Sequence, residues 1–297
     1  VFGAGGRAVL ADVDEATWGL SPKTVEPLVG ANTWGVIPVH LYGNPCDAVG
    51  LRLLCEERGL VMVEDCAEAI GTYADGKHAG SLADAACFSF FGNKTITTGE
   101  GGMVLFQDPD RARVAQIIRA HGISPERRYW HEVVGFNYRM TNMQAAVGLA
   151  QVERAEELVG SKLTHASEYA ELIEGLKGLS MMPPSPFGRC SYWLVPILVD
   201  GSREQRDLLM EMLAARGIQT RETFPPLHRM PAFAGLRGAA AFPALVIEDD
   251  AVLHPRFDEV LPLAWSHRPP RAGALSQETA AVHVASGHKA KAALPLA

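Results

Sequence analysis

Residues 34–64 read WGVIPVHLYGNPCDAVGLRLLCEERGLVMVE. This segment begins and ends with a short apolar run of strand length, from Trp34 to His40 and from Leu60 to Glu64. Between the runs, Asp47 stands where a helix N-cap is expected, before an amphipathic stretch that ends at Gly59. Strand, helix and strand within roughly 30 residues are typical of a βαβ unit, whose parallel strands are buried. The segment therefore predicts an α/β fold.

Further apolar runs extend the predicted sheet. Residues 85–90 and 102–106 have strand length, and residues 108–121 between the second run and the next turn predict a helix. Residues 141–158 predict a long helix, because most of their apolar side chains fall on one helical face. Alternating strands and helices of this kind indicate a mainly parallel sheet.

Breaks in the pattern of predicted helices and strands indicate two domains and a tail. We expect residues 1–155 to form a large domain, followed by a small α+β domain over 156–243 with its own strand at 192–199. Residues 244–297 show weak periodicity, and their last part is rich in His, Arg, Pro and Ala. Such a segment predicts a divergent tail that is loosely structured or disordered.

Composition excludes several classes of protein. The formal net charge of −7 and the absence of a Lys/Arg stripe disfavour a nucleic-acid-binding protein. The five cysteines are odd in number, irregularly spaced and without a Cys-x-x-Cys pair. This usage argues against a disulfide framework or a zinc site and for a reducing, cytoplasmic location. No apolar run approaches the roughly 18 residues that suggest a membrane span.

Three residues stand where chemistry is expected. Asp65 directly follows a predicted strand, and ligands of open α/β sheets bind at the carboxyl ends of strands. Lys94 lies between Phe90-Phe91 and a turn rich in Thr and Gly, where partial desolvation favours the neutral amine that can attack a carbonyl carbon. Asn137 precedes a predicted helix start, which suits phosphate. Taken singly, each has an ordinary alternative: a helix cap for Asp65 and Asn137, and a solvated surface position for Lys94.

Five longer segments carry a family resemblance. They read IPVHLYG from Ile37, VEDCAEAIG from Val63, GSLADAACFSFF from Gly80, NKTITTGEGGM from Asn93 and GFNYRMTNMQAA from Gly135. In this order and spacing they resemble the DegT/DnrJ/EryC1/StrS sugar aminotransferase family, over about residues 7–235. The resemblance implies fold type I of the pyridoxal-phosphate-dependent transferases (aspartate aminotransferase-like), with pyridoxal 5′-phosphate as cofactor and no metal.

The resemblance also implies a role for individual residues. Lys94 is similar to the lysine that carries the cofactor, and Asp65 to the aspartate that pairs with the pyridine nitrogen. Ser89 matches the serine that binds the cofactor phosphate, and Glu68 matches a position beside the ring that is usually Gln, His or Glu. Asn137 matches an asparagine that reaches the phosphate of the neighbouring subunit's cofactor, which implies a homodimer with shared sites.

The implied reaction is the transfer of an amino group from glutamate to a nucleotide-linked 4-keto-6-deoxy sugar. The segments around Glu68, 92–94 and 124–131 are similar to a subgroup that converts GDP-4-keto-6-deoxymannose to GDP-perosamine. Arg221 and His228 match a family stretch near the substrate, and ordinary surface and loop roles are the alternative.

The sequence departs from the family pattern at both ends. Family members begin several tens of residues earlier, with a phosphate loop and an aromatic residue that stacks on the ring, so we expect an N-terminally truncated fold. The family's closing segment is not recognisable after about Phe242. Another nucleotide-sugar aminotransferase, or an inactive or regulatory protein of the same fold, therefore stays open. A Rossmann-type nucleotide-binding protein is disfavoured, because no Gly-x-Gly-x-x-Gly follows a strand.

Overall fold

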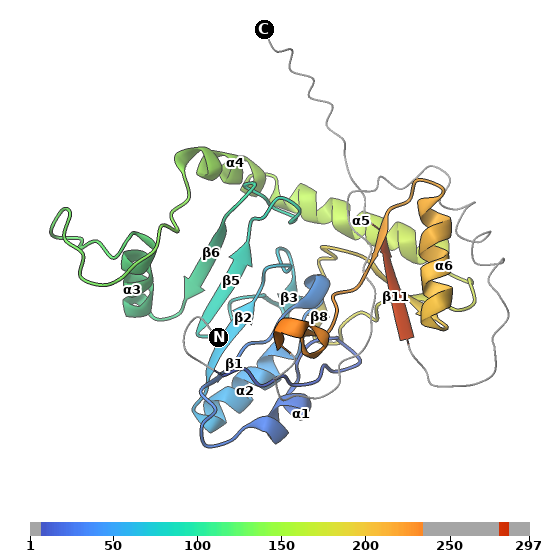
Figure 1. Cartoon of the computed structure of the whole chain (residues 1–297), viewed down its shortest axis with the longest axis horizontal. Coiled ribbons are helices and arrows are strands. Elements are labelled where there is room, and N and C mark those ends of the chain that lie inside the picture. The colour runs from blue at the N-terminus through green and yellow to red at the C-terminus, as the bar shows by residue number, and fades with distance from the viewer. Residues whose placement is uncertain (1–6, 234–278, 285–297) are drawn as a thin grey trace, which may run out of the picture. The chain divides into compact units, whose positions relative to one another are not determined.

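The computed structural model describes residues 7–233 and 279–284 of the chain (Figure 1). The chain divides into two compact units. Residues 13–160 and 184–193 form the first, called the large unit below, and the small unit contains the other described residues, 7–12, 161–183, 194–233 and 279–284. The boundaries predicted at residues 155 and 243 stay predictions. The return of residues 184–193 to the large unit was not expected from the sequence.

The large unit contains a four-stranded sheet of order β1-β2-β5-β6. Strands β1, β2 and β5 run parallel, and β6 is antiparallel to β5. Their bounds are Gly35–Val36, Val61–Asp65, Ala85–Ser89 and Gly102–Phe106. This arrangement confirms the predicted α/β fold with a mainly parallel sheet.

The predicted βαβ unit is present, with a shorter first strand than expected. Helix α2 (Ala48–Arg58) begins after Asp47, whose side chain accepts a hydrogen bond from the Gly50 N–H, and ends at Gly59 with φ 64°. Pro38 has no N–H to donate to a ladder. Its carbonyl nevertheless accepts a hydrogen bond of 2.8 Å from the N–H of Asp65, so the chain stays beside β2 beyond the end of β1.

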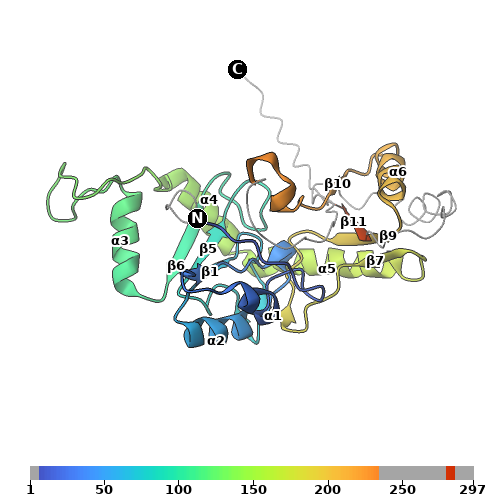
Figure 2. The ribbon, with the colours of Figure 1, turned by 60° about the horizontal axis from the view of Figure 1, so that its bottom comes forward.

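Helices precede, connect and follow the strands of this sheet along the chain. Helix α1 (Pro22–Val25) lies beside α2, as Figure 2 also shows, and α3 (Pro109–Arg119) lies against β6. The helix predicted over 141–158 is two helices, α4 (Asn142–Val152) and α5 (Ala155–Ile173). Thr141 caps α4 through its hydroxyl, which accepts from the Gln144 N–H. No helix among the described residues is long and apolar enough to cross a membrane.

Short elements complete the large unit. A three-stranded sheet has the order β4-β3-β8, with bounds Lys77–His78, Tyr73–Ala74 and Gly188–Arg189. Single turns of 3-10 helix lie at Glu26–Leu28 and Leu41–Gly43. Because β8 comes from the returning segment 184–193, this small sheet fastens that segment to the unit.

Burial differs sharply between parts of the large unit. A fully buried cluster of Cys66, Ala69, Ala79 and Ala86, with Phe88, packs beneath the ends of β2 and β5. Helix α4, in contrast, has no buried residue, and Met143 on its apolar face is 82% exposed. The apolar face predicted for this helix is thus uncovered in the single chain.

The small unit is built on a second four-stranded sheet, of order β10-β11-β9-β7. The bounds are Thr220–Glu222, Thr279–Val284, Pro196–Asp200 and Leu179–Met181, and helix α6 spans Arg203–Ala214. Single 3-10 turns lie at Leu227–Arg229 and Pro231–Phe233. Strand β11 lies antiparallel between β9 and β10. Residues 279–284 of the predicted tail thus form a strand, the other residues of the tail lie outside the described part of the chain, and the expectation for the tail stays a prediction.

Candidate active site at the ends of two parallel strands

The predicted site residues of the large unit follow two neighbouring strands. Strand β2 ends at Asp65 and β5 ends at Ser89, and the two strands are parallel with Asp65 opposite Cys87. Glu68 lies in the turn after β2, and Lys94 in the turn after β5. Since the carboxyl ends of parallel strands meet at one edge of a sheet, all four residues belong to the same edge.

Lys94 is held close to a carboxylate and an aromatic face. Its Nζ lies 3.5 Å from Glu68 Oε1 and 3.8 Å from the ring centre of Trp193. Only 13% of the Lys94 side chain is exposed. The backbone N–H of Lys94 donates to the Phe91 carbonyl at 3.0 Å, which fixes the turn. The structure thus brings Lys94 and Glu68 together in a nearly enclosed position.

Glu68 is a buried carboxylate with few donors. Its Oε2 accepts a hydrogen bond of 2.8 Å from the backbone N–H of Tyr42, and its Oε1 faces Lys94. Burial raises the pKa of Glu68, and the opposing effects of the Lys94 charge and the Tyr42 N–H do not cancel the rise. A carboxyl of this kind can hold or release a proton nearer neutrality than an ordinary glutamate.

Tyr42 and Trp193 complete this side of the site. Their rings are stacked, with centroids 6.4 Å apart and planes 14° from parallel. Trp193 donates its indole N–H to the carbonyl of Asn93 at 2.8 Å. The motif around Tyr42 was recognised in the sequence, but no role was assigned to the tyrosine. Trp193 gave no signal at all, because it is about a hundred residues away from Lys94 in the chain.

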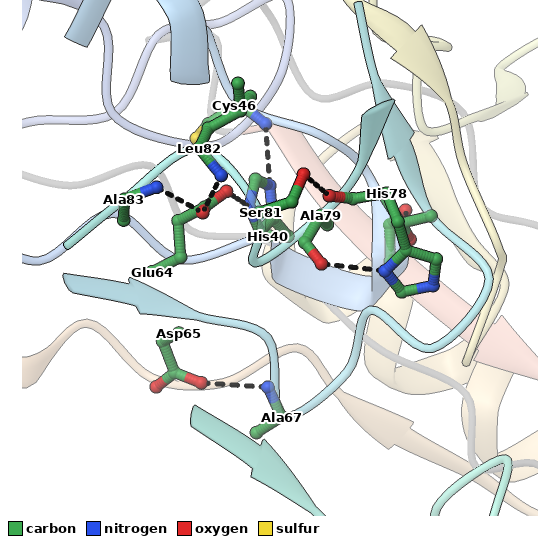
Figure 3. Close-up of polar contacts among 12 residues, drawn as sticks. His40, Cys46, Glu64, Asp65, Ala67, His78, Ala79, Ser81, Leu82 and Ala83 are labelled. Carbon is green, nitrogen blue, oxygen red and sulfur yellow. Dashed lines mark hydrogen bonds and ion pairs between the residues drawn. The ribbon is translucent and has the colours of Figure 1, made fainter. Parts of the chain in front are cut away.

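Asp65 presents an open acceptor. It is partly buried, and its Oδ1 accepts one hydrogen bond of 3.0 Å from the Ala67 N–H (Figure 3). Within the described residues no hydrogen bond reaches the other carboxylate oxygen. A carboxylate held at a strand end with one free oxygen can accept a proton-bearing ring nitrogen from a ligand.

Ser89 and the following turn offer donors. The Ser89 hydroxyl oxygen accepts from the Phe91 N–H at 3.3 Å, and its own proton is then available to an anion. The turn returns to β6 through Gly99 and Gly101, at φ 78° and 145°, conformations that glycine adopts without strain. Together with Asp65 and Lys94, the donor set suits a ligand with a ring nitrogen, a carbonyl and a phosphate.

A second buried cluster lies behind β2, on the face opposite Asp65, because successive side chains of a strand alternate. His40 Nε2 lies 3.0 Å from Glu64 Oε1, and both side chains are fully buried. Glu64 Oε2 accepts from the N–H groups of Leu82 and Ala83 at 3.1 Å each (Figure 3). Burial opposes ionisation of Glu64, but the bonds from His40 and the backbone outweigh it and hold its pKa below the usual value.

This His40–Glu64 cluster is internally satisfied. The Cys46 N–H donates to His40 Nδ1 at 3.3 Å, so the ring proton is assigned to Nε2, which donates to Glu64. The Cys66 sulfur also lies near these two residues, and burial raises the pKa of its thiol strongly. Both ring nitrogens and the carboxylate already have partners. The cluster is therefore a structural support for β2 that sequence reasoning missed.

The remaining predicted residues belong to other elements of the chain. Asn137 is exposed and bridges to Ala120 before α4. Arg221 and His228 belong to the small unit, where the Arg221 guanidinium lies 4.9 Å from the Phe224 ring centre. The predicted roles of these three residues stay predictions.

Comparison with known proteins supplies the context for this edge. Residues 1–248 match the sequence profile of the DegT/DnrJ/EryC1/StrS aminotransferase family. GDP-perosamine synthase of Caulobacter vibrioides is 42% identical over 234 residues, which are 78% of this chain and 63% of that protein. EpsN of Bacillus subtilis, named as a candidate pyridoxal phosphate-dependent aminotransferase, is 33% identical over 231 residues, 76% of this chain and 59% of its own.

Solved structures of known proteins have a similar fold. The aminotransferase TlmJ from Streptoalloteichus hindustanus has a TM-score of 0.75 and 31% identity, and the match covers 80% of this chain and 65% of TlmJ. DesI, solved in the presence of its TDP-sugar product, has a TM-score of 0.73 and 28% identity over 94% of this chain and 64% of DesI. The chain spans less than two thirds of the length of the curated relative GDP-perosamine synthase. The predicted family and fold type are both confirmed.

Proposed function

Because this chain belongs to the DegT/DnrJ/EryC1/StrS aminotransferase family, we propose that it binds pyridoxal 5′-phosphate at the edge formed by β2 and β5 and transfers an amino group from glutamate to a nucleotide-linked keto-sugar. One observation carries the proposal. The nearly enclosed amine of Lys94 and the open carboxylate oxygen of Asp65 lie at the ends of adjacent parallel strands.

The residues at this edge fit the cofactor. Lys94 would hold it through its amine, Asp65 would accept the proton of the pyridine nitrogen, and Ser89 would donate to the phosphate. Glu68 lies beside Lys94, where the ring would lie. When bound, pyridoxal phosphate supplies an electron sink for carbanion chemistry.

The side chains would divide the proton transfers between them. Asp65 keeps a proton on the ring nitrogen, because an ionised carboxylate at hydrogen-bonding distance stabilises the positive charge. Lys94 moves a proton within the site as a general base and acid. The raised pKa of Glu68 allows this carboxyl to exchange a proton with the amine 3.5 Å away. Near-complete burial of both side chains limits competing proton exchange with water.

GDP-4-keto-6-deoxymannose is the proposed sugar, with GDP-perosamine as product. The 42% identity to the Caulobacter vibrioides GDP-perosamine synthase supports this substrate. The TDP-sugar in the DesI structure supports the broader class of nucleotide sugars. Arg221 and His228 stay proposed as substrate-binding residues.

A homodimer is proposed on the uncovered part of the large unit. Residues 103–152 include exposed apolar side chains on β6, α4 and the loop between α3 and α4, among them Val134 at 90% and Met143 at 82% exposure. Apolar surface of this extent is typical of a face covered by a partner. Asn137 belongs to this surface, in agreement with its proposed reach into a neighbouring site.

The five free cysteines support a reducing, cytoplasmic setting.

The test has two steps. The chain is mixed with pyridoxal phosphate, reduced with borohydride and digested, and the modified peptide is identified by mass spectrometry. We expect the modification at Lys94. The loaded protein is then supplied with glutamate and GDP-4-keto-6-deoxymannose, and the aminated nucleotide sugar is sought, with a UDP-linked 3-keto sugar as the comparison substrate. Modification at other lysines alone would overturn the proposal, and cofactor capture without amino transfer would favour a regulatory or inactive protein.

A further inference from the structure

We propose that Trp193 is a positioning residue, which holds both the amine of Lys94 and the turn that carries it. The importance of this contact for catalysis rests on the proposed function, whereas the contact itself does not. Trp193 is the last residue of the segment 184–193 that returns to the large unit. It therefore brings a distant part of the chain to the predicted cofactor lysine.

Trp193 contacts the Lys94 turn at two separate points. The face of its ring lies 3.8 Å from Lys94 Nζ, well within the distance at which an aromatic face attracts an ammonium group. Its indole N–H donates to the carbonyl of Asn93, the residue before Lys94, at 2.8 Å. One side chain thus fixes the tip of the lysine and the backbone at its base.

Trp193 is itself rigidly placed. Only 2% of it is exposed, and its ring stacks on the fully buried ring of Tyr42. The backbone N–H of Tyr42 donates to Glu68, the carboxylate that lies 3.5 Å from Lys94 Nζ. Tyr42 therefore supports both neighbours of the amine, the aromatic face and the carboxylate. The Lys94 amine is bounded from two directions by groups that share one anchor.

Contacts of the residue two positions before Trp193 hold this arrangement in place. Ser191 donates its N–H to the Gly43 carbonyl at 3.1 Å, and its hydroxyl lies 2.8 Å from that of Thr72. A Cβ on Gly43, at φ 82°, would meet the Ser191 hydroxyl oxygen at 2.3 Å, so glycine is required there. This close approach sets the distance between the Tyr42 and Trp193 segments.

Three variants separate the roles. Trp193→Phe keeps an aromatic face but removes the N–H donor, and Trp193→Leu removes both. Trp18→Leu is the matched control, since Trp18 is another buried tryptophan of the same unit, at 6% exposure. Thermal unfolding of all three variants is measured first, and every other measurement is made well below the lowest midpoint.

The first readout needs no cofactor. Lysines are reductively methylated with ¹³C-formaldehyde, which keeps their charge, and the Lys94 signal is identified by its absence in Lys94→Arg. We expect an upfield ring-current shift of the Lys94 methyl groups in the protein without substitutions and in Trp18→Leu. The shift should be smaller in Trp193→Phe and absent in Trp193→Leu. Hydrogen exchange of residues 91–95 should quicken in both Trp193 variants.

The second readout is the rate at which Lys94 captures pyridoxal phosphate before borohydride reduction. We expect Trp193→Leu to capture it about tenfold more slowly, because the amine and its turn are no longer held in position, and Trp18→Leu at the original rate. An unshifted Lys94 signal in the original protein, or equal capture rates in Trp193→Leu and the original, would overturn the positioning role. Equal losses in Trp18→Leu would do the same. A shifted signal without any capture at Lys94 would count against the proposed function and support the positioning.

Discussion

Glu64 and Glu68 are buried carboxylates four positions apart, one on β2 and the other in the turn after it, yet their pKa values shift in opposite directions. Glu64 receives hydrogen bonds from His40, Leu82 and Ala83, and its pKa is lowered. Glu68 receives one backbone N–H and faces Lys94 at 3.5 Å, and its pKa is raised. Burial acts on both, so the number of donors within hydrogen-bonding distance decides the direction.

This difference separates support from reactivity. A carboxylate whose oxygens are all engaged is fixed in one charge state and stabilises the strand behind the site. A carboxylate with fewer donors keeps the capacity to exchange a proton with a neighbouring amine. The predictions below test this division, from the largest expected effect to the smallest.

Replacing Lys94 with alanine should have the largest effect. Without the amine, reduction with borohydride should leave no cofactor on the peptide that contains residue 94, and amino transfer should fall by about a thousandfold or more, because both the attachment and a general base are lost. Peptide mapping and a transfer assay check this. If the cofactor were still attached at another lysine and amino transfer were normal, Lys94 would not be the reactive residue.

Replacing Glu64 with alanine should mainly reduce stability. The change leaves the N–H groups of His40, Leu82 and Ala83 buried without their acceptor. Each buried donor left without its acceptor costs about 1–3 kcal/mol of unfolding free energy. Urea unfolding of Glu64→Ala measures the loss, with Glu57→Ala as an exposed control, its side chain being 72% accessible. A loss no greater than that of the control would mean that the cluster does not support β2.

Replacing Asp65 with asparagine should weaken cofactor binding while leaving folding nearly unchanged. Asp65 gives up one hydrogen bond to the Ala67 N–H, which an amide oxygen can replace, but asparagine has no charge for a protonated ring nitrogen. We expect about a 10–100-fold weaker affinity for pyridoxal phosphate, because losing the carboxylate charge should lower the pKa of the protonated ring nitrogen by about one to two units. Equilibrium titration followed by absorbance gives the affinity. An unchanged affinity would remove Asp65 from the site.

Replacing Glu68 with glutamine should produce a small effect that depends on pH. Because the folded pKa of Glu68 is raised, the folded state binds its proton more tightly than the unfolded state. The original protein should therefore lose stability relative to Glu68→Gln as pH rises from about 4.5, by at most about 1.4 kcal/mol per pH unit. Urea midpoints across pH 4–8 test the slope.

Glu64→Gln provides the opposite case for the same measurement. The folded pKa of Glu64 is lowered, so its contribution is present above the unfolded value and lost as pH falls through the folded value. The original protein should lose its advantage over Glu64→Gln on acidification. Two variants with slopes of the same sign would contradict the division between the carboxylates.

The sequence predicted the site where chemistry coincides with strand ends. Asp65 directly follows a predicted apolar strand, which was enough to place it where β2 ends, whereas Ser89 was assigned only through the family resemblance, because the predicted strand continued to residue 90. Lys94 follows in the next turn, and the resemblance of its segment supplied its role. These inferences used local order, which a single sequence contains.

The parts that could not be predicted depend on contacts between distant residues. Trp193 meets Lys94 only because residues 184–193 return to the large unit, and no local pattern marks that return. His40 and Glu64 looked like ordinary strand residues until their pairing across 24 positions was visible. Strand β11 was missed because weak periodicity hid a segment that pairs on both sides.

The return of residues 184–193 also determines how this protein can be divided. A polypeptide cut after residue 160 would retain β2, β5 and Lys94 but would lack Trp193 and the partner that Asn44 finds in the N–H of Ser185. A ten-residue peptide with the sequence of 184–193 supplies both missing pieces. The lysine-bearing half and this peptide form a natural pair for fragment complementation, in which assembly can be followed by the fluorescence of a single indole when the other tryptophans are replaced.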